Sequence, residues 1–125
     1  MWNDCWPACA GWAFVDYYCL PKASFYSFKR CAGTLITSID KTDSYDIYLC
    51  NDSLFEKQTV LSVSYVKDGA YTHITEFEAT IPAQMSQKVY SLPLSVLPEG
   101  ALLLCDMTSS EMHDRAFYRN GTLPI

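Results

Sequence analysis

Positive charge and long apolar runs are what this sequence has least of. Nine Lys and Arg stand against fourteen Asp and Glu, which gives a formal net charge of -5. Without a basic stripe or a polybasic tract the chain has little to neutralise phosphates or anionic lipids, so neither nucleic acid nor a membrane is expected as a partner. No apolar run approaches the ~20 residues of a membrane span, and the start lacks the features of a signal peptide.

Metal-ligand spacing is also missing, although the chain has six Cys and two His. There is no CxxC and no Cys/His pair at zinc-ligand distance, so neither a metal nor a cofactor is expected. The separation of Cys50 and Cys105 suits a bridge between the two sheets of an immunoglobulin-like sandwich. Against this reading, free cysteines commonly act as small buried hydrophobes, and we favour that interpretation. Reduced thiols would indicate a cytoplasmic location for this chain and for any longer protein that contains it, with a secreted or lysosomal location as the alternative.

The pattern of the chain changes once, near Cys31. Residues 21–31 begin with Pro and end with Lys29 and Arg30, as expected of a short helix whose dipole favours cations at its end. After Gly33 every segment is rich in Val, Ile, Tyr, Phe and Thr and is bounded by turn residues, which predicts strands. The predicted strands are 35–39, 46–51, 59–66, 73–81, 88–94, 101–107 and 115–119.

About seven strands at this spacing predict an all-β fold, an immunoglobulin-like two-sheet sandwich. An irregular Trp-rich segment and the short helix precede it. Residues 1–31 are expected to form the end of another domain with a connecting helix, and residues 32–125 the sandwich. Glu76 and Glu78 flank Phe77, which predicts a solvated face on that strand.

All three Trp of the chain lie before position 13, where a terminus is ordinarily polar and poorly ordered. We therefore expect Trp2, Trp6 and Trp12 to form an apolar patch, and expect the chain either to self-associate through this segment or to fold it back over the rest of the chain. The start reads Trp2-Asn3-Asp4-Cys5-Trp6-Pro7. It continues with Trp12 to Tyr18, Pro21-Lys22-Ala23, Phe25-Tyr26 and Lys29-Arg30.

These two runs resemble the β-mannosidase type of family 2 glycoside hydrolases. In that family a run similar to W-Q-x-N-D-x-W-P closes the catalytic TIM barrel, and a run similar to W-A-x-V-D-Y-Y-x-x-P-K-A leads into a β-sandwich domain. The likeness is tight over about the first 31 residues and looser afterwards. The first Trp of the family's opening run has no counterpart here.

The resemblance implies that both catalytic glutamates lie on barrel strands that precede this segment, so no catalytic residue is expected in this chain. It places Trp2, Asn3, Asp4 and Trp6 on the last barrel strand, whose end faces the active site. These four could therefore contact a mannoside or another glycan at the rim of the site in the intact parent. The alternative is that they only join the barrel to the sandwich.

Three functions follow as alternatives. The first is an accessory immunoglobulin-like domain of a β-mannosidase-like hydrolase, with the catalytic barrel as its partner. The second is a carbohydrate-binding module that stacks sugars on Tyr17, Tyr18, Phe25 and Tyr26. The third is a free-standing immunoglobulin-like interaction domain. Aromatic residues in and beside a short helix more often belong to a core or an interface, which favours the first.

Overall fold

A computed structural model describes residues 2–6 and 11–121. The chain divides into two compact units, Met1–Gly33 and Thr34–Ile125. Each unit has its own backbone hydrogen bonds and its own packed side chains.

The first unit is built around a short backbone ladder. Asn3 bridges Val15 in parallel, and Val15 bridges Pro21 in the antiparallel sense. The Asp4 amide donates to the Val15 carbonyl at 2.9 Å, and the Val15 amide donates to the Trp2 carbonyl at 3.1 Å. Val15 is buried at the centre of this ladder. Three short segments, around Asn3, Val15 and Pro21, are therefore held together by main-chain bonds.

The helix α1 (Ala23–Cys31) follows the ladder directly. Lys29 and Arg30 occupy its last turn, where cations interact favourably with the helix dipole. Its aromatic side chains contact the preceding segment: Phe28 stacks on Phe14 with ring centroids 4.6 Å apart, and Phe25 meets Trp2 edge to face at 5.8 Å. The helix predicted from Pro21 is confirmed and begins two residues later.

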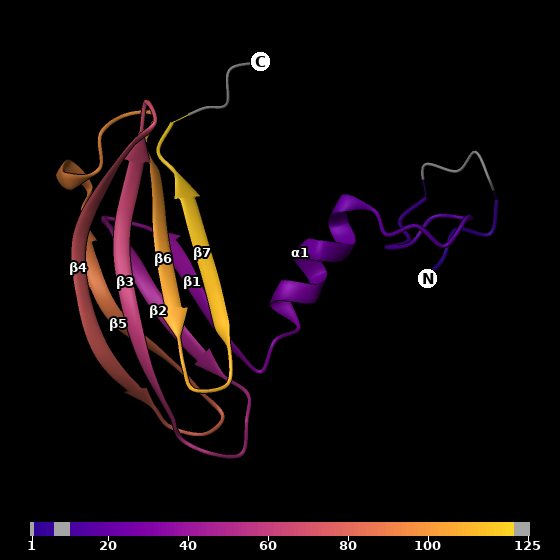
Figure 1. The fold of residues 1–125 in the computed structure, drawn as a ribbon, viewed down its shortest axis with the longest axis horizontal. Helices are drawn as coiled ribbons and strands as arrows, with labels where there is room; N and C mark the ends of the chain where they lie inside the picture. Colours follow the sequence, from indigo (N-terminus) through magenta and orange to yellow (C-terminus); the bar gives the residue numbers. More distant parts are fainter. Residues whose placement is uncertain (1, 7–10, 122–125) are drawn as a thin grey trace. The chain divides into compact units, whose positions relative to one another are not determined.

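The second unit contains seven strands in two antiparallel sheets (Figure 1). Their bounds are β1 (Leu35–Lys41), β2 (Ser44–Asn51), β3 (Lys57–Lys67), β4 (Ala70–Ile81), β5 (Met85–Pro93), β6 (Leu102–Thr108) and β7 (His113–Arg119). A short 3-10 helix, η1 (Leu94–Val96), follows β5. The predicted all-β sandwich of seven strands is confirmed.

The strand orders are β1-β2-β5 in one sheet and β4-β3-β6-β7 in the other. In a constant-type immunoglobulin domain the fourth strand pairs with the fifth, in a sheet of four, and the other sheet has three strands. Here β4 pairs with β3 instead, in register from Lys57 opposite Ile81 to Lys67 opposite Ala70. The sandwich therefore has its larger sheet on the β3-β6 side.

Side chains point alternately to the two faces of each sheet, and those on the inner faces form the core. In β3 the side chains of Leu61 and Val63 are fully buried, and in β6 Leu103, Cys105 and Met107 are fully buried. Their neighbours in sequence point to the outer face of the same sheet. Glu76 and Glu78 of β4 are exposed while Phe77 between them is partly buried, so the solvated face predicted there is confirmed.

One buried carboxylate joins the two sheets. Asp114 in β7 accepts hydrogen bonds from both the amide and the hydroxyl of Thr37 in β1, at 2.8 and 2.9 Å. Both residues are buried. Because β1 and β7 belong to different sheets, these bonds fix the position of one sheet on the other.

Candidate functional site

Aromatic side chains are the main exposed feature of the first unit. Trp2 is 54% exposed, Trp6 68% and Trp12 99%. Tyr17, Tyr18 and Tyr26 are also exposed. Soluble monomers seldom leave this many large apolar groups in water, so the unit has the composition of a surface that binds something.

Asp4 is the one rim candidate that does not face solvent. Its side chain is 3% exposed, and Oδ2 lies 2.5 Å from the Nζ of Lys22. The same Nζ donates to the Gly11 carbonyl at 3.1 Å. The other carboxylate oxygen, Oδ1, is buried with no hydrogen-bond partner among the described residues. In this conformation the carboxylate of Asp4 holds Lys22 and the ladder together and is not presented to a ligand.

The other three rim candidates are exposed side chains, those of Trp2, Asn3 and Trp6. Trp2 also contacts Phe14 and Phe25, with ring centroids 6.0 and 5.8 Å away, so one side of its indole is already covered. Trp6 thus has the larger free surface of the two indoles.

The four aromatic residues considered as a stacking platform do not lie flat together. The rings of Tyr17 and Tyr18 are perpendicular, at 88°, and those of Phe25 and Tyr26 meet at 89°. Phe25 is partly buried against Trp2. Stacking on a sugar ring uses an aromatic face. Each pair presents one face and one edge, so a sugar could use only one ring of each.

The bridge considered between Cys50 and Cys105 does not form, and both thiols are free. Cys105 points into the core, where burial, and to a lesser extent the nearby carboxylates of Asp106 and Asp114, raise its pKa to about 12. Cys50 lies between Leu49 and Asn51, whose side chains are fully buried, so its own side chain points to the outer face of its sheet. Both cysteines were expected to be small buried hydrophobes, and of the two only Cys105 is fully buried.

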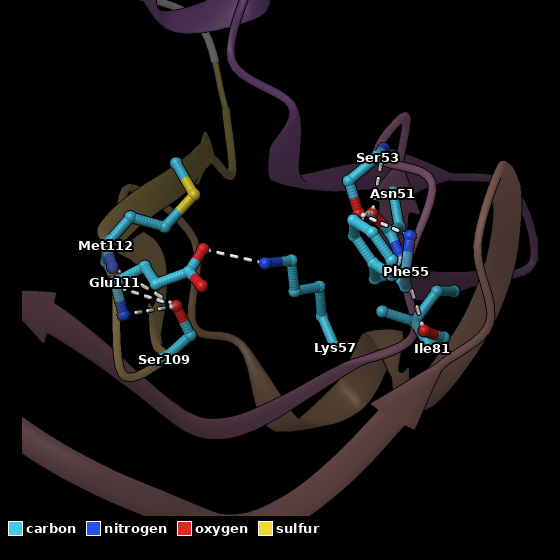
Figure 2. Close-up of polar contacts among 8 residues, drawn as sticks. All are labelled: Asn51, Ser53, Phe55, Lys57, Ile81, Ser109, Glu111 and Met112. Carbon is cyan, nitrogen blue, oxygen red and sulfur yellow. Dashed lines mark hydrogen bonds and ion pairs between the residues drawn. The ribbon is translucent and has the colours of Figure 1, made fainter.

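In the second unit one group of polar contacts lies at the end of the sandwich where β1 begins. Asn51, which is fully buried there, has Oδ1 2.6 Å from the Ser53 hydroxyl and 3.0 Å from the Ser53 amide. Its Nδ2 donates to the carbonyls of Phe55 and Ile81 at 2.9 and 3.3 Å (Figure 2). The carbonyl of Pro82 lies 3.0 Å from the same Nδ2, so its two N–H groups are shared among three acceptors. This one side chain therefore shapes the β2–β3 loop and ties it to the end of β4.

The β2–β3 loop exposes two adjacent apolar side chains. Leu54 and Phe55 are each 73% exposed. Across the same end, Lys57 and Glu111 form an ion pair at 2.7 Å between β3 and the β6–β7 loop, and the Ser109 hydroxyl accepts from the Met112 amide at 3.1 Å (Figure 2). The loop end is thus ordered by hydrogen bonds while its tip remains apolar and open.

A hollow of about 410 Å³ lies on the four-stranded sheet near the same end. Its lining is mainly hydroxyl, amide and carboxylate groups, with Val60 and Ala79 as apolar members and no aromatic ring. The polar members are Gln58, Thr59, Glu78, Thr80, Thr108, Ser109 and Ser110. These groups can hydrogen-bond hydroxyls, but the lining offers no aromatic face on which a sugar ring could stack.

Metal ligation and membrane crossing find no support within residues 2–6 and 11–121. In this part of the chain no group of three or more His, Cys, Asp or Glu is placed to hold a metal ion. No helix there has the length and hydropathy needed to cross a lipid bilayer.

Comparison with known proteins adds a structural relationship. No protein-family model matches the sequence, and no curated protein matches it. Among solved structures, the β-D-mannosidase of Dictyoglomus thermophilum superposes with a TM-score of 0.82 at 23% identity, over 94% of this chain and 15% of that chain. The fold is that of part of a β-mannosidase. The resemblance noted from the first 31 residues is therefore confirmed, and this chain spans only a small share of that enzyme's length.

Two site features could not be read from the sequence. The pairing of Asp4 with Lys22 joins residues 18 positions apart, and nothing in either motif signals it. The role of Asn51 has a partial signal, since Asn followed two residues later by Ser is typical of a side-chain-capped turn. Its bonds to the carbonyls of Ile81 and Pro82 come from a distant segment and needed the structure.

Proposed function

We propose that this chain is an accessory β-sandwich part of a β-mannosidase-like glycoside hydrolase, which supports the catalytic barrel and is not catalytic by itself. The observation that carries the proposal is the superposition on 15% of a β-D-mannosidase, with nearly all of this chain included. A retaining glycosidase needs two carboxylates about 5 Å apart, and the family resemblance puts both in the barrel.

The exposed aromatic residues of the first unit support the same proposal. Trp6 and Trp12 cover large apolar areas that water solvates poorly, at about 25 cal/mol per Å². A barrel packed against this segment would remove that area from water. The barrel is therefore the partner that we propose for the first unit.

An activity assay tests the absence of catalysis in this chain. We expect no hydrolysis of 4-nitrophenyl β-D-mannopyranoside by the purified 125-residue chain, under conditions where an intact β-mannosidase shows turnover. Turnover that copurifies with the chain and is abolished by substituting one of its own carboxylates would overturn the proposal.

A second candidate, a carbohydrate-binding module, is favoured by one observation, the nearly complete exposure of Trp12 together with exposed Tyr18 and Tyr26. Titration with mannose, mannobiose and a mannan, followed by tryptophan fluorescence and by calorimetry, separates the two. Saturable binding that is lost in Trp12→Ala would support the module. No response at millimolar sugar would leave the accessory role.

A further inference from the structure

We propose that the outer face of the four-stranded sheet binds a second copy of this chain through a two-fold axis parallel to the strands. The proposal concerns β4, β3, β6 and β7, which form one layer of the sandwich (Figure 1). It is independent of the proposed function.

The middle of this face is unusually apolar for the outside of a sandwich, which is ordinarily polar. The outward positions of β3 and β6 include Val60, Val66, Leu102 and Leu104, none of which is in the buried core. Phe117 on the neighbouring strand β7 is 66% exposed. These side chains give the face a water-excluding centre.

The burial of Ser64 shows that water is already excluded from part of this centre. It lies on the outward side of β3, opposite Leu104 and His73, and is fully buried. Its hydroxyl has no hydrogen-bond partner among the described residues. Buried hydroxyls are ordinarily paired, so an unpaired one on an outer face indicates that apolar side chains cover it.

Charge is distributed unequally between the two edges of the face. The edge strand β4 carries Glu76 and Glu78, and the opposite edge strand β7 carries His113, Arg115 and Arg119. All five side chains belong to exposed residues. One edge is therefore acidic and the other basic, with the apolar positions between them.

Strand register shows which residues share a row across the sheet. Glu76 lies beside Ser62, Ser62 beside Asp106, and Asp106 beside Arg115. In the same way Glu78 shares a row with His113, and Tyr71 shares a row with Arg119. These three rows thus begin at one edge and end at the other with complementary groups, and the fourth row, from His73 through Ser64 and Leu104 to Phe117, is mainly apolar.

A two-fold axis parallel to the strands, lying between two facing copies, places β4 of one copy over β7 of the other at the same height. Glu76 then faces Arg115 of the second copy, and symmetry repeats the contact, so two such pairs form. Tyr71 faces Arg119, a cation–π arrangement. An axis perpendicular to the strands would instead set Glu76 and Glu78 against themselves.

Arg115 already binds Asp106 with its Nε and Nη2, at 2.6 and 3.1 Å. A guanidinium carries five N–H groups, so one Arg can engage two carboxylates. Asp106 holds the Arg115 side chain along its row, which reduces the entropy lost when Glu76 of a second copy approaches.

The area of the face sets the expected strength. Four strands about 4.8 Å apart and four rows about 6.8 Å apart span roughly 500 Å² per copy. Interfaces of this size lie at the low end for specific complexes and are transient. We therefore expect a weak dimer that is populated only at high protein concentration.

Sedimentation equilibrium of the 125-residue chain, at low and high salt, tests the proposal. We expect a monomer–dimer equilibrium that weakens with salt, because its edge contacts are exposed ion pairs. Glu76→Lys should weaken association about tenfold or more, which corresponds to the loss of about 1.4 kcal/mol. Glu56→Lys makes the same charge change on an exposed loop residue away from this face and should leave the Kd unchanged.

A mixing experiment tests the axis itself. Arg115→Glu should also fail to self-associate, since the introduced carboxylate would face Glu76 of the second copy. Mixed one to one, the Glu76→Lys and Arg115→Glu chains should form a heterodimer. In it the introduced ammonium of one chain meets the introduced carboxylate of the other, and the native pair remains on the other side. Circular dichroism of each variant checks that it is folded.

A chain that stays monomeric at millimolar concentration would overturn the proposal. So would a dimer that is insensitive to Glu76→Lys and disappears in Trp12→Ser, because association would then use the first unit. A mixture in which the two charge variants remain monomeric would contradict the assigned axis.

Discussion

Asn51 is hydrogen-bonded from a fully buried position to Ser53 and to the carbonyls of Phe55, Ile81 and Pro82. Asn51→Ala leaves these carbonyls buried without this partner, and we expect a loss of about 2–4 kcal/mol in the free energy of unfolding. Urea denaturation measures the change. The exposed neighbour Asp52 provides the control, since Asp52→Ala should change stability by less than about 0.5 kcal/mol. Equal effects of the two substitutions would contradict the assigned role of Asn51.

The carboxylate of Asp46 provides a prediction about pH. Hydrogen bonds from the hydroxyls of Ser91 and Ser44, and then the ammonium of Lys88, lower its pKa from 3.8 to about 2. Because the pKa is lower in the folded state, the unfolded chain binds the proton more readily. The stabilisation by Asp46 is therefore present above pH 3.8 and is lost as the pH falls towards 2.

Asp46→Asn removes this titration. We expect urea denaturation between about pH 5 and pH 2 to show a smaller fall in stability for the variant than for the unmodified chain. Asp52→Asn, at an exposed position in the β2–β3 loop, is the control and should show the same fall in stability as the unmodified chain. Parallel pH profiles for Asp46→Asn and the unmodified chain would be inconsistent with the lowered pKa.

The cysteine residues should differ in reactivity because they differ in burial. Burial raises the pKa of Cys105 to about 12, so almost none of it is thiolate at neutral pH. Cys19 and Cys31 are exposed. In native conditions we expect iodoacetamide to modify Cys19 and Cys31 and to leave Cys105 unmodified until urea unfolds the chain. Peptide mapping by mass spectrometry resolves the sites, and early modification of Cys105 would argue against a closed core.

At the scale of elements, the strands were predictable because their cause is local. Alternation in Leu61, Ser62 and Val63, and turn residues at Asp68-Gly69, indicate a strand and its end without knowledge of the partner. Which strand pairs with which is set by contacts between distant segments, so the pairing of β4 with β3 could not be predicted from the local pattern. For the same reason the spacing of the cysteines did not reveal that Cys50 points to the outer face. In the candidate site, too, local features were predictable and contacts between distant residues were not. Exposure of Trp2 and Trp6 was expected from the concentration of Trp at the start of the chain, whereas the burial of Asp4 against Lys22 was not.

The ladder of the first unit depends on the Asp4–Lys22 pair. Lys22→Met keeps much of the aliphatic stem but leaves a buried carboxylate unpaired, which is strongly destabilising. We expect faster cleavage within residues 2–33 in limited proteolysis and a changed tryptophan emission. Lys29→Met, on an exposed position of α1, serves as the matched control. Identical proteolysis of both variants would show that the pair does not hold the ladder.

At the scale of the whole molecule, the two units have different features. The sandwich has a continuous core that extends from Leu35 to Ala116 and polar bonds between its sheets. The first unit has a backbone ladder, a helix without a fully buried residue and a set of exposed aromatic rings. The sandwich is a folded domain, and the first unit, which precedes it in sequence, exposes apolar rings. This combination fits our proposal of an accessory part that packs on a larger catalytic domain.

The most direct test is to isolate, from the organism that makes it, the polypeptide that carries this sequence, using an antibody against the purified chain. Its mass and its hydrolysis of 4-nitrophenyl β-D-mannopyranoside are then measured together. Our account predicts a polypeptide several times longer than 125 residues with β-mannosidase activity. A 14.2 kDa polypeptide without that activity, or a longer one that does not hydrolyse the substrate, would contradict it.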